Sequence, residues 1–317
     1  MNVSTSSGHT RLVVVYGALR SGTTMLRLML DGHPDIACCH ERDFMLDHLE
    51  PTPTGWRLNK KNLQEDWIFR INELSVPEST DGAEAFADLC AQDTARSSKK
   101  IHILVVHRHV DRLLDLRPDI PIIHMLRDPR DVARSSIGMG WAGNTWYGAD
   151  HWIETETKWK EQTHRMARDQ VFDLQYEGLL EAPEDRLQAL CNFLGLDYTP
   201  QMLDYSERST YKPVDPSLAY QWKRKQTPRE VAELDHKLHD LLTSSGYAPG
   251  PLPASAPGSW RRAQLGFENK RHIWKIMIQR YGVMDPLLLR IGRRLGLDGM
   301  KHAAKRRIAH KRQAHLK

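Results

Sequence analysis

The sequence predicts an α/β fold in which a central parallel sheet is covered by helices on both faces. Apolar runs rich in β-branched residues alternate with segments of helical pattern, and two of these runs lead directly into a loop and a helix. Strands are expected at residues 12–16, 101–106, 121–126 and 171–176, with helices between them. Because ligands bind at the carboxyl ends of the strands in such sheets, a site is expected in the loops that follow the strands.

The first junction between a strand and a loop has the pattern of an anion-binding loop. The strand LVVVY runs into GALRSGTT at residues 17–24, and apolar residues then recur on one face of a helix. Backbone N–H groups of such a loop and the positive end of the helix dipole bind phosphate or sulfate. A nucleoside-triphosphate loop has a lysine directly after its second glycine, whereas Thr23 follows Gly22 here and the cation is Arg20. The loop predicts an anion site, with a solvated turn as the alternative, and it weakens the case for a kinase or ATPase.

The second junction repeats this order of strand, loop and helix. The strand IIHML ends at Arg127, after which Asp128 is suited to cap a helix and a proline is suited to be its first residue. An ion pair of Arg130 or Arg134 with Asp131 would stabilise the start of that helix. The sequence therefore places a second strand end with a basic residue beside a helix start.

Together, GALRSGTTMLRLMLDGHPDI and IIHMLRDPRDVARSS resemble the 5′-phosphosulfate loop and the 3′-phosphate motif of the sulfotransferases that use 3′-phosphoadenosine 5′-phosphosulfate (PAPS). The resemblance covers residues 11–247 and is closest to the tyrosylprotein sulfotransferases, which share the loop arginine and the HPD that follows. It implies a three-layer, P-loop-like fold and transfer of the sulfuryl group of PAPS to an acceptor hydroxyl. The products would be the sulfated acceptor and 3′,5′-phosphoadenosine, without a metal ion. The acceptor stays open among a glycan, a lipid-linked group, a small molecule and a tyrosine.

The resemblance also implies roles for individual residues. The cofactor-binding residues that it implies are Arg20, Ser21, Gly22, Thr23, Thr24, Arg127, Ser135, Tyr176 and Ser206. The catalytic residues that it implies are Glu41, Arg20, Lys100 and Ser206. Two departures from the family pattern leave the acceptor open. KKIH at residues 99–102 stands where the family has Lys-Thr-Pro or Lys-Asp-Pro, and QW at residues 221–222 stands where the tyrosylprotein subgroup has Lys-Trp.

Elementary chemistry supports the main roles. Sulfuryl transfer passes through a planar, SO₃-like state in which charge builds on the leaving phosphate oxygen, so Arg20 and nearby backbone N–H groups can stabilise that state. Glu41, as a carboxylate at the mouth of the site, can accept the proton of the attacking hydroxyl. Arg127 and Ser135 can converge on one phosphate, which would distinguish PAPS from an analogue that lacks the 3′-phosphate.

Charge is distributed unevenly along the chain. Residues 260–317 hold 16 basic and 3 acidic side chains, a net charge of +13, whereas the rest of the chain carries −8. The segment APGPLPASAPGS at residues 248–259 predicts a linker, preceded by a flexible N-terminus at 1–10 and a sulfotransferase domain at 11–247. Residues 260–317 predict a helical basic extension whose amphipathic helices would bind an anionic membrane surface or an acidic acceptor, or would pack on the body.

Composition narrows the remaining classes of function. No run approaches the ~18 apolar residues of a membrane span and the start lacks a signal-peptide pattern, so a cytoplasmic protein is expected, with peripheral membrane attachment as an option. The four cysteines lack metal-ligand spacing, and His102, His107 and His109 alternate without a partner at such spacing, so no metal is predicted. Two alternatives stay open: a P-loop kinase-like phosphotransferase, and a non-enzymatic protein that binds membranes or nucleic acid. No specific nucleic acid is expected as a partner.

Overall fold

The computed structural model describes residues 10–297, 299, 303, 307 and 308. Its central sheet has five parallel strands in the order β2-β5-β1-β6-β7. These strands are β1 (Arg11–Tyr16), β2 (Ile36–Glu41), β5 (Ile101–Val106), β6 (Ile122–Leu126) and β7 (Val171–Gln175). The predicted parallel sheet is confirmed, and β2 is a strand that the sequence analysis missed because its run IACCHE ends in polar residues.

The other elements of the described chain are a hairpin, α-helices and 3₁₀ helices. A separate antiparallel hairpin consists of β3 (Leu49–Thr52) and β4 (Gly55–Leu58). The α-helices are α1 (Thr23–Leu30), α2 (Phe44–Asp47), α3 (Lys60–Glu65), α4 (Trp67–Ile71), α5 (Gly82–Thr94), α6 (Val110–Leu116), α7 (Pro129–Gly138), α8 (Thr145–Gly148), α9 (Asp150–Gln162), α10 (Tyr176–Glu181), α11 (Pro183–Leu194), α12 (Trp222–Lys225), α13 (Pro228–Leu238), α14 (Asp240–Ser244), α15 (Ser259–Tyr281) and α16 (Met284–Leu295). The 3₁₀ helices are η1 (Thr163–Arg165), η2 (Arg168–Gln170), η3 (Pro200–Met202), η4 (Asp204–Glu207) and η5 (Pro216–Leu218).

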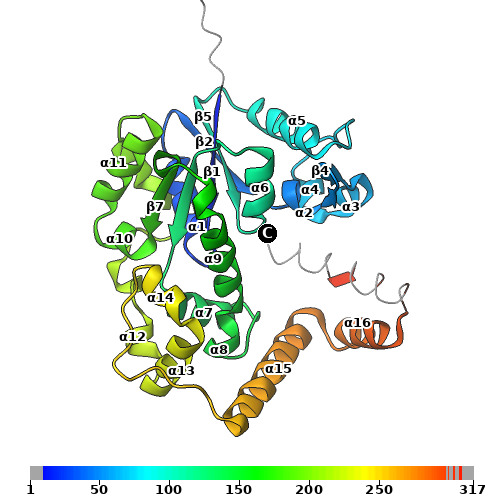
Figure 1. The fold of residues 1–317 in the computed structure, drawn as a ribbon, viewed down its shortest axis with the longest axis vertical. Coiled ribbons are helices and arrows are strands. Elements are labelled where there is room, and N and C mark those ends of the chain that lie inside the picture. The colour runs from blue at the N-terminus through cyan, green and yellow to red at the C-terminus, as the bar shows by residue number, and fades with distance from the viewer. Residues whose placement is uncertain (1–9, 298, 300–302, 304–306, 309–317) are drawn as a thin grey trace, which may run out of the picture. The chain divides into compact units, whose positions relative to one another are not determined.

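Alternate side chains of the central strand face opposite sides of the sheet. Val13 and Val15 pack in a core that includes residues of α1 and α11, whereas Val14 and Tyr16 pack in a core that includes residues of α5 and α6. All four side chains are fully buried. Helices therefore cover both faces of the sheet (Figure 1), which gives the three layers that were predicted.

The strand order decides where a ligand can bind. β1 pairs with β5 on one side and with β6 on the other, so the chain leaves the carboxyl ends of β1 and β6 next to each other. Such a position, from which connections run in opposite directions, is where open α/β sheets bind ligands. The loop after β1 and the loop after β6 are the two anion-site candidates, and the fold brings them to one edge.

The described chain divides into two compact units by its internal contacts. The first unit contains the described residues up to 132 together with 151–225 and 240–248, and it holds the whole central sheet. The second contains residues 133–150, 226–239 and the described residues from 249 onward. The predicted boundaries at 247 and 260 stay a prediction. Residues 1–9 of the predicted flexible N-terminus lie outside the described residues.

Helix α15 is held within the second unit by one of its faces. The Asn144 side chain donates to the Leu265 carbonyl at 2.8 Å, and the Asn269 side chain accepts from the Gly143 backbone N–H at 2.6 Å. Leu265 is buried. The first helix of the predicted basic extension is thus packed along the face that carries Leu265 and Asn269.

None of the helices in the described part of the chain is both long enough and apolar enough to cross a membrane.

Candidate active site

The backbone of the loop after β1 requires glycine at positions 17 and 22. A Cβ on Gly17 would lie 2.4 Å from the Met125 carbonyl oxygen, and one on Gly22 would lie 2.3 Å from the Tyr176 ring. Gly22 has a φ of 96°, and Arg20, which is not a glycine, has a φ of 74°. Strained residues of this kind gather at ligand sites, because the surrounding structure must hold them there.

Helix α1 begins at Thr23 directly after this loop. Its N-cap is Gly22, which has no side chain to satisfy the first N–H groups of the helix. These N–H groups and the positive end of the helix dipole are therefore directed toward the loop, where an anion would be stabilised. The His151 side chain fixes the outer part of the loop through the Leu19 carbonyl, 2.9 Å from Nε2.

Two buried polar atoms mark the loop and the end of β6 as a ligand site. The Ser21 side chain is fully buried, and among the residues that the structure describes its Oγ has no hydrogen-bond partner. Arg127 Nε is likewise buried and unpartnered within the described part of the chain. Buried polar atoms are nearly always hydrogen-bonded in folded proteins. A hydroxyl and a guanidinium N–H that lack an acceptor fit a bound anion.

Arg127 connects the two strand ends. Its Nη1 donates to the Arg20 carbonyl at 3.1 Å, and its guanidinium carbon lies 4.3 Å from the centre of the Tyr176 ring. The Trp152 indole donates to the Arg127 carbonyl at 3.1 Å. The structure thus brings Arg20, Arg127 and Tyr176 together, and their roles in binding a cofactor stay predictions. Ser135 lies on α7, in the second unit, and its role stays a prediction.

The start of α7 is braced from several sides. Asp128 accepts from the Arg130 guanidinium at 2.8 Å and from the Trp222 indole at 2.8 Å. The Asp131 carboxylate accepts from the Trp222 backbone N–H at 2.7 Å, and the Arg130 guanidinium carbon lies 3.7 Å from the centre of the Trp222 ring. Arg130 therefore forms its ion pair with Asp128. Trp222, which directly follows the Gln221 that departs from the family pattern, holds the helix that follows Arg127.

A buried carboxyl group lies behind this helix start. Glu177 accepts from the Asp128 backbone N–H at 2.9 Å and from the Tyr247 hydroxyl at 3.0 Å. Burial raises the pKa of Glu177 to about 7. The fold therefore carries a carboxyl group that titrates near neutral pH directly behind the predicted 3′-phosphate loop.

The predicted base, Glu41, lies at the carboxyl end of β2 and is 54% exposed at its side chain. Its Oε1 lies 3.6 Å from Nε2 of His107, which directly follows β5 and is buried. His107 Nδ1 lies 2.8 Å from the Gly17 carbonyl, and since a carbonyl only accepts, Nδ1 carries the proton. The imidazole thus lies between the Gly17 carbonyl, to which it is hydrogen-bonded, and the Glu41 carboxylate, which is within ion-pair distance.

The charges of this pair are set by each other. The His107 imidazole beside Glu41 lowers the pKa of that carboxyl group. Burial opposes a charged imidazole, but the carboxylates of Glu41 and Asp43 outweigh it and raise the pKa of His107. Glu41 is therefore ionised and accessible near neutral pH, which is the state a proton acceptor needs. His107 could have been found from the sequence only by asking which residue follows a strand adjacent to β1.

Lys100 is not brought to this site. It precedes β5, at the opposite end of the strand from His107, where its exposed ammonium forms an ion pair with Asp35 at 2.8 Å. The expectation that Lys100 is a transition-state cation is therefore corrected, because the length of β5 separates it from the loop. Arg108, directly after His107, forms a two-bond ion pair with Asp47, with N–O distances of 2.6 Å, and its charge helps to lower the pKa of Glu41.

Ser206 lies on η4, a 3₁₀ helix that packs against α1. It is partly buried. The neighbouring Tyr205 is buried in the core, and its hydroxyl donates to the Lys212 carbonyl at 2.9 Å. This anchors the segment but assigns no contact to the serine, so Ser206 stays a prediction.

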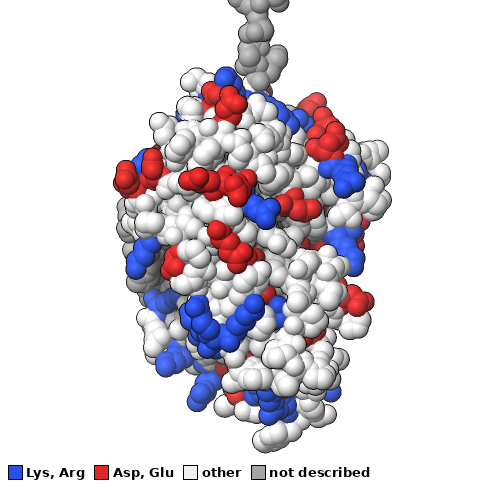
Figure 2. Space-filling view, turned by 90° about the vertical axis from the view of Figure 1, so that its left-hand side faces the viewer, with Lys and Arg blue, Asp and Glu red and all other residues white. Residues whose placement is uncertain are grey.

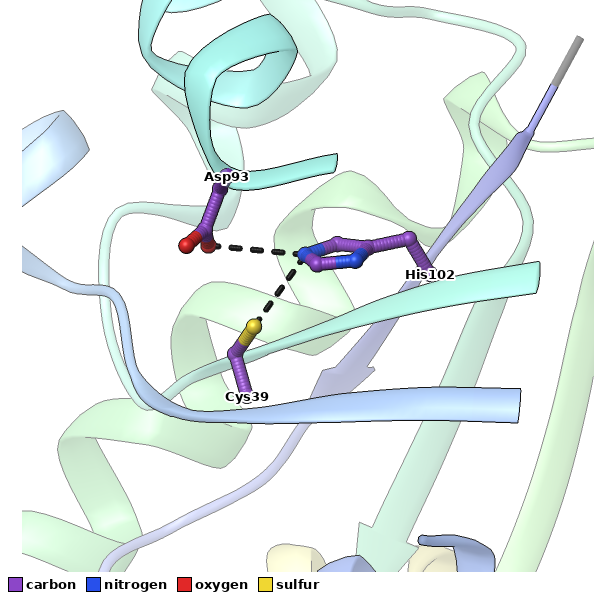
Figure 3. Close-up of side chains that lie close together, drawn as sticks. All are labelled: Cys39, Asp93 and His102. Atoms are coloured by element: carbon purple, nitrogen blue, oxygen red, sulfur yellow. Dashed lines mark hydrogen bonds and ion pairs between the residues drawn. The ribbon is translucent and has the colours of Figure 1, made fainter. Parts of the chain in front are cut away.

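The side chains of Cys39, Asp93 and His102 form a cluster of potential metal ligands (Figure 3). Cys39 Sγ lies 3.1 Å from His102 Nε2, and the same nitrogen lies 3.4 Å from an Asp93 oxygen. The Arg42 guanidinium already forms two hydrogen bonds to Asp93, at 2.7 and 3.0 Å. Burial raises the pKa of the Cys39 thiol to about 12. An uncharged thiol and a carboxylate neutralised by arginine suit a hydrogen-bonded brace better than a cation site.

The alternating histidines of the sequence do not converge on one point. His102 belongs to the cluster with Cys39, His107 faces Glu41, and His109 lies 3.1 Å from an Asp47 oxygen. Because each imidazole faces a different carboxylate or thiol, their spacing along the chain gives no shared set of ligands. Arg42 directly follows Glu41, so its ion pair with Asp93 also fixes the backbone next to the predicted base.

Comparison with known proteins bears directly on this site. Residues 13–200 match the model of the sulfotransferase family. The chain belongs to the sulfotransferase family. It is 29% identical over 213 residues to a putative protein-tyrosine sulfotransferase of Caenorhabditis briggsae, an alignment that covers 63% of this chain and 71% of that protein. It is 24% identical over 304 residues to protein-tyrosine sulfotransferase 1 of Danio rerio, covering 83% of this chain and 79% of that protein.

The fold is likewise similar to that of a solved sulfotransferase structure. The sulfotransferase domain of the Synechococcus PCC 7002 olefin synthase superposes with a TM-score of 0.58 at 20% identity, covering 77% of this chain and 98% of that domain. The predicted P-loop-like fold of a sulfotransferase is thereby confirmed. As a sulfotransferase, the chain is an enzyme that transfers sulfuryl groups, and the kinase-like and non-enzymatic alternatives are set aside.

One expectation is corrected by these relatives. The protein-tyrosine sulfotransferases that the chain matches are Golgi membrane enzymes, which contradicts the expected cytoplasmic location. The cellular compartment is not a property of the folded domain, so the apolar runs and the leader pattern of a sequence do not determine it.

Proposed function

We propose that this sulfotransferase takes its sulfuryl group from PAPS and passes it to a hydroxyl-bearing acceptor with Glu41 as the base. The observation that carries the donor site is the pair of buried, unpartnered polar atoms, Ser21 Oγ and Arg127 Nε. A nucleotide with a 5′-phosphosulfate and a 3′-phosphate offers an anionic acceptor to each of them. Ordinary solvated turns do not bury such atoms without a partner.

The loop residues would hold the 5′ side of the donor. The backbone N–H groups from Gly22 onward, the Ser21 hydroxyl and the hydroxyls of Thr23 and Thr24 are donors at the start of α1. Arg20 would stabilise the charge that develops on the leaving phosphate oxygen. Arg127, with Ser135 and Ser206 as further proposed contacts, would hold the 3′-phosphate, and Tyr176 would fix the Arg127 guanidinium by its ring.

The chemical step needs one proton acceptor. The acceptor oxygen bonds to sulfur while the bond from sulfur to the 5′-phosphate oxygen breaks, and the hydroxyl proton passes to the Glu41 carboxylate. Glu41 is suited to this because it is exposed, ionised and oriented by buried His107. We expect the reaction to proceed without a metal ion, which activity in the presence of EDTA would test.

The acceptor that we propose to test first is a tyrosine in a protein. The reason is that the relatives from Caenorhabditis briggsae and Danio rerio are named protein-tyrosine sulfotransferases. The extension from residue 260 onward, with its net charge of +13, is proposed to bind an anionic partner. The face drawn in Figure 2 carries charge of both signs, since blue basic and red acidic side chains both occur on it.

Transfer of label from ³⁵S-labelled PAPS tests the proposed function. Paired peptides that differ only by tyrosine or phenylalanine are incubated with the enzyme in EDTA, and incorporation is measured after separation. We expect label in the tyrosine peptide alone. Label on another class of acceptor would correct the acceptor but keep the reaction. A protein that neither binds 3′,5′-phosphoadenosine nor labels any hydroxyl acceptor in a broad panel would overturn the proposal.

A further inference from the structure

Helix α15 presents large aromatic side chains to solvent. Trp260, Phe267 and Trp274 recur at intervals of seven residues and therefore share one face of the helix. Trp260 is 84% exposed and Phe267 is 68% exposed. Single exposed apolar residues are common, but two large aromatic side chains in line on one helix face form a patch that calls for a partner.

The aromatic face lies opposite the face by which α15 is anchored. Leu265, Asn269, His272 and Ile276 follow each other by three or four residues and make the contacts to the rest of the second unit. On a helix of 3.6 residues per turn, this set lies about 180° from Trp260 and Phe267. The anchoring contacts therefore hold the aromatic side chains on the outer side of α15.

Helix α16 continues the same kind of surface. Its side chains at positions 284, 287, 291 and 295 lie on one face and belong to Met284, Leu287, Ile291 and Leu295. Met284 is 65% exposed and Leu295 is 64% exposed. The Arg290 guanidinium carbon lies 5.6 Å from the centre of the Trp274 ring, which links the two helices. The opposite face of α16 is buried at Asp285 and Leu289.

Basic side chains border both apolar faces. The exposed lysines and arginines beside them are Lys270, Arg271, Lys275, Arg290 and Arg294. Acidic side chains are scarce in this part of the chain, since residues 260–317 hold 3 of them against 16 basic ones. A second copy of this surface would bring like charges together, and an acidic protein alone would not require an exposed tryptophan. Tryptophan, aliphatic side chains and arginine together suit the boundary between lipid head groups and acyl chains.

We propose that the outer face of α15 and α16, made of Trp260, Phe267, Trp274, Met284, Leu287, Ile291 and Leu295, docks on an anionic lipid bilayer. The apolar side chains would enter the head-group region, while the bordering basic side chains meet lipid phosphates and carboxylates. The proposal names the anionic partner of the extension and does not depend on the sulfuryl-transfer reaction.

Co-sedimentation of the full chain with vesicles tests this docking surface. Wild-type protein is mixed with vesicles of phosphatidylcholine alone or with added phosphatidylserine, at low and at high salt. A variant of the apolar face of α16, Leu287→Glu/Leu295→Glu, is called the stripe variant. It is compared with the matched control Leu218→Glu/Leu252→Glu, which makes the same changes at exposed leucines elsewhere. A charge variant, Arg290→Gln/Arg294→Gln, is compared with Lys61→Gln/Arg168→Gln, which removes the same charge from exposed positions of the first unit.

We expect the wild type to bind the anionic vesicles at low salt and to be released at high salt, because screening weakens the basic contacts. The stripe and charge variants should each bind at least roughly tenfold more weakly than the wild type, while both controls bind as the wild type does. Calorimetry with 3′,5′-phosphoadenosine should give the same affinity for every variant, so a failure here is distinguishable from a failure of the donor site.

Three outcomes would overturn the docking surface. The first is wild-type protein that ignores anionic vesicles at low salt. The second is a stripe variant that binds as tightly as its control. The third is dimerisation in sedimentation velocity that the stripe variant abolishes while vesicles remain unbound, which would assign the face to a second copy of the chain.

Discussion

The Arg127 guanidinium donates a hydrogen bond to the backbone carbonyl of Arg20, across 3.1 Å. Arg127 directly follows β6 and Arg20 lies in the loop after β1, so this bond joins the two loops that the sequence marks as anion sites. Because Arg20 has a φ of 74°, the bond also helps to hold a backbone conformation that most residues avoid. A ligand that engages both loops would meet an Arg127 guanidinium that is already bonded to the backbone of the first loop.

Replacing Arg127 should separate recognition of the two ends of the donor. Arg127→Ala removes the charge-assisted contact proposed for the 3′-phosphate, so affinity for 3′,5′-phosphoadenosine should fall by roughly 10-fold to 100-fold. Affinity for 5′-AMP, which lacks that phosphate, should change far less. Calorimetry with both nucleotides measures the two effects, and equal losses for both would show that Arg127 does not read the 3′-phosphate.

Ser21→Ala should change binding without harming stability. The Ser21 hydroxyl is buried and, within the described residues, unpartnered, so its removal from the free protein relieves a cost of about 1–3 kcal/mol and should leave the melting temperature unchanged or higher. Affinity for 3′,5′-phosphoadenosine should nevertheless fall, because the hydroxyl finds its acceptor only in the complex. Thermal unfolding with and without nucleotide measures both. A destabilised Ser21→Ala protein with normal nucleotide affinity would assign the hydroxyl to the fold.

The pH dependence of turnover should report the pair of Glu41 and His107. A base acts only when deprotonated, so activity falls as the pH drops through the pKa of Glu41, which His107 holds low. His107→Gln removes the charge but keeps hydrogen-bonding capacity, so the acid limb of the kcat/KM profile should move to higher pH. His107→Lys, which returns a positive charge, should move the acid limb part of the way back to lower pH. A profile that His107→Gln leaves in place would make His107 a residue of the fold alone.

Glu177 should make stability fall as the pH rises through neutrality. Its folded pKa of about 7 lies above that of an exposed glutamate, so the folded state holds the proton longer than the unfolded state does. The stabilisation is complete at acidic pH, below the unfolded pKa, and is lost as the pH rises toward 7. Each unit of difference between the folded and the unfolded pKa corresponds to about 1.4 kcal/mol of stability. The free energy of unfolding of the wild type minus that of Glu177→Gln, measured from pH 4 to 8, should therefore decline with pH. A flat or rising difference would contradict the raised pKa.

The local features of the fold could be predicted from the sequence, and the non-local ones could not. The loops after β1 and β6 were found because strand, loop, cap and helix follow one another along the chain. His107 and Glu41 are 66 positions apart and meet only because β5 pairs with β2, a strand that was not predicted. Lys100 was expected as a transition-state cation, but it precedes β5 and lies at the opposite end of that strand from His107.

The brace around α7 escaped the sequence analysis for a similar reason. Asp128 was expected to cap the helix, but Trp222, whose indole donates to its carboxylate, and Glu177, which accepts from its backbone N–H, come from segments that approach it only in the folded state. Side chains that reach one residue from distant segments leave no spacing pattern. Chemistry carried by a single loop is therefore predictable, whereas the side chains that orient it require the fold.

The central claim is that Glu41 accepts the proton of the acceptor while the two loops hold the donor. The most direct test is transfer of label from ³⁵S-labelled PAPS by Glu41→Gln, with donor-site affinity measured by calorimetry with 3′,5′-phosphoadenosine on the same preparation. Glutamine keeps the size and hydrogen bonding of the side chain but cannot accept the proton, so turnover should drop by ~10²–10⁴ at unchanged nucleotide affinity. Full turnover by Glu41→Gln, with nucleotide bound normally, would contradict the claim.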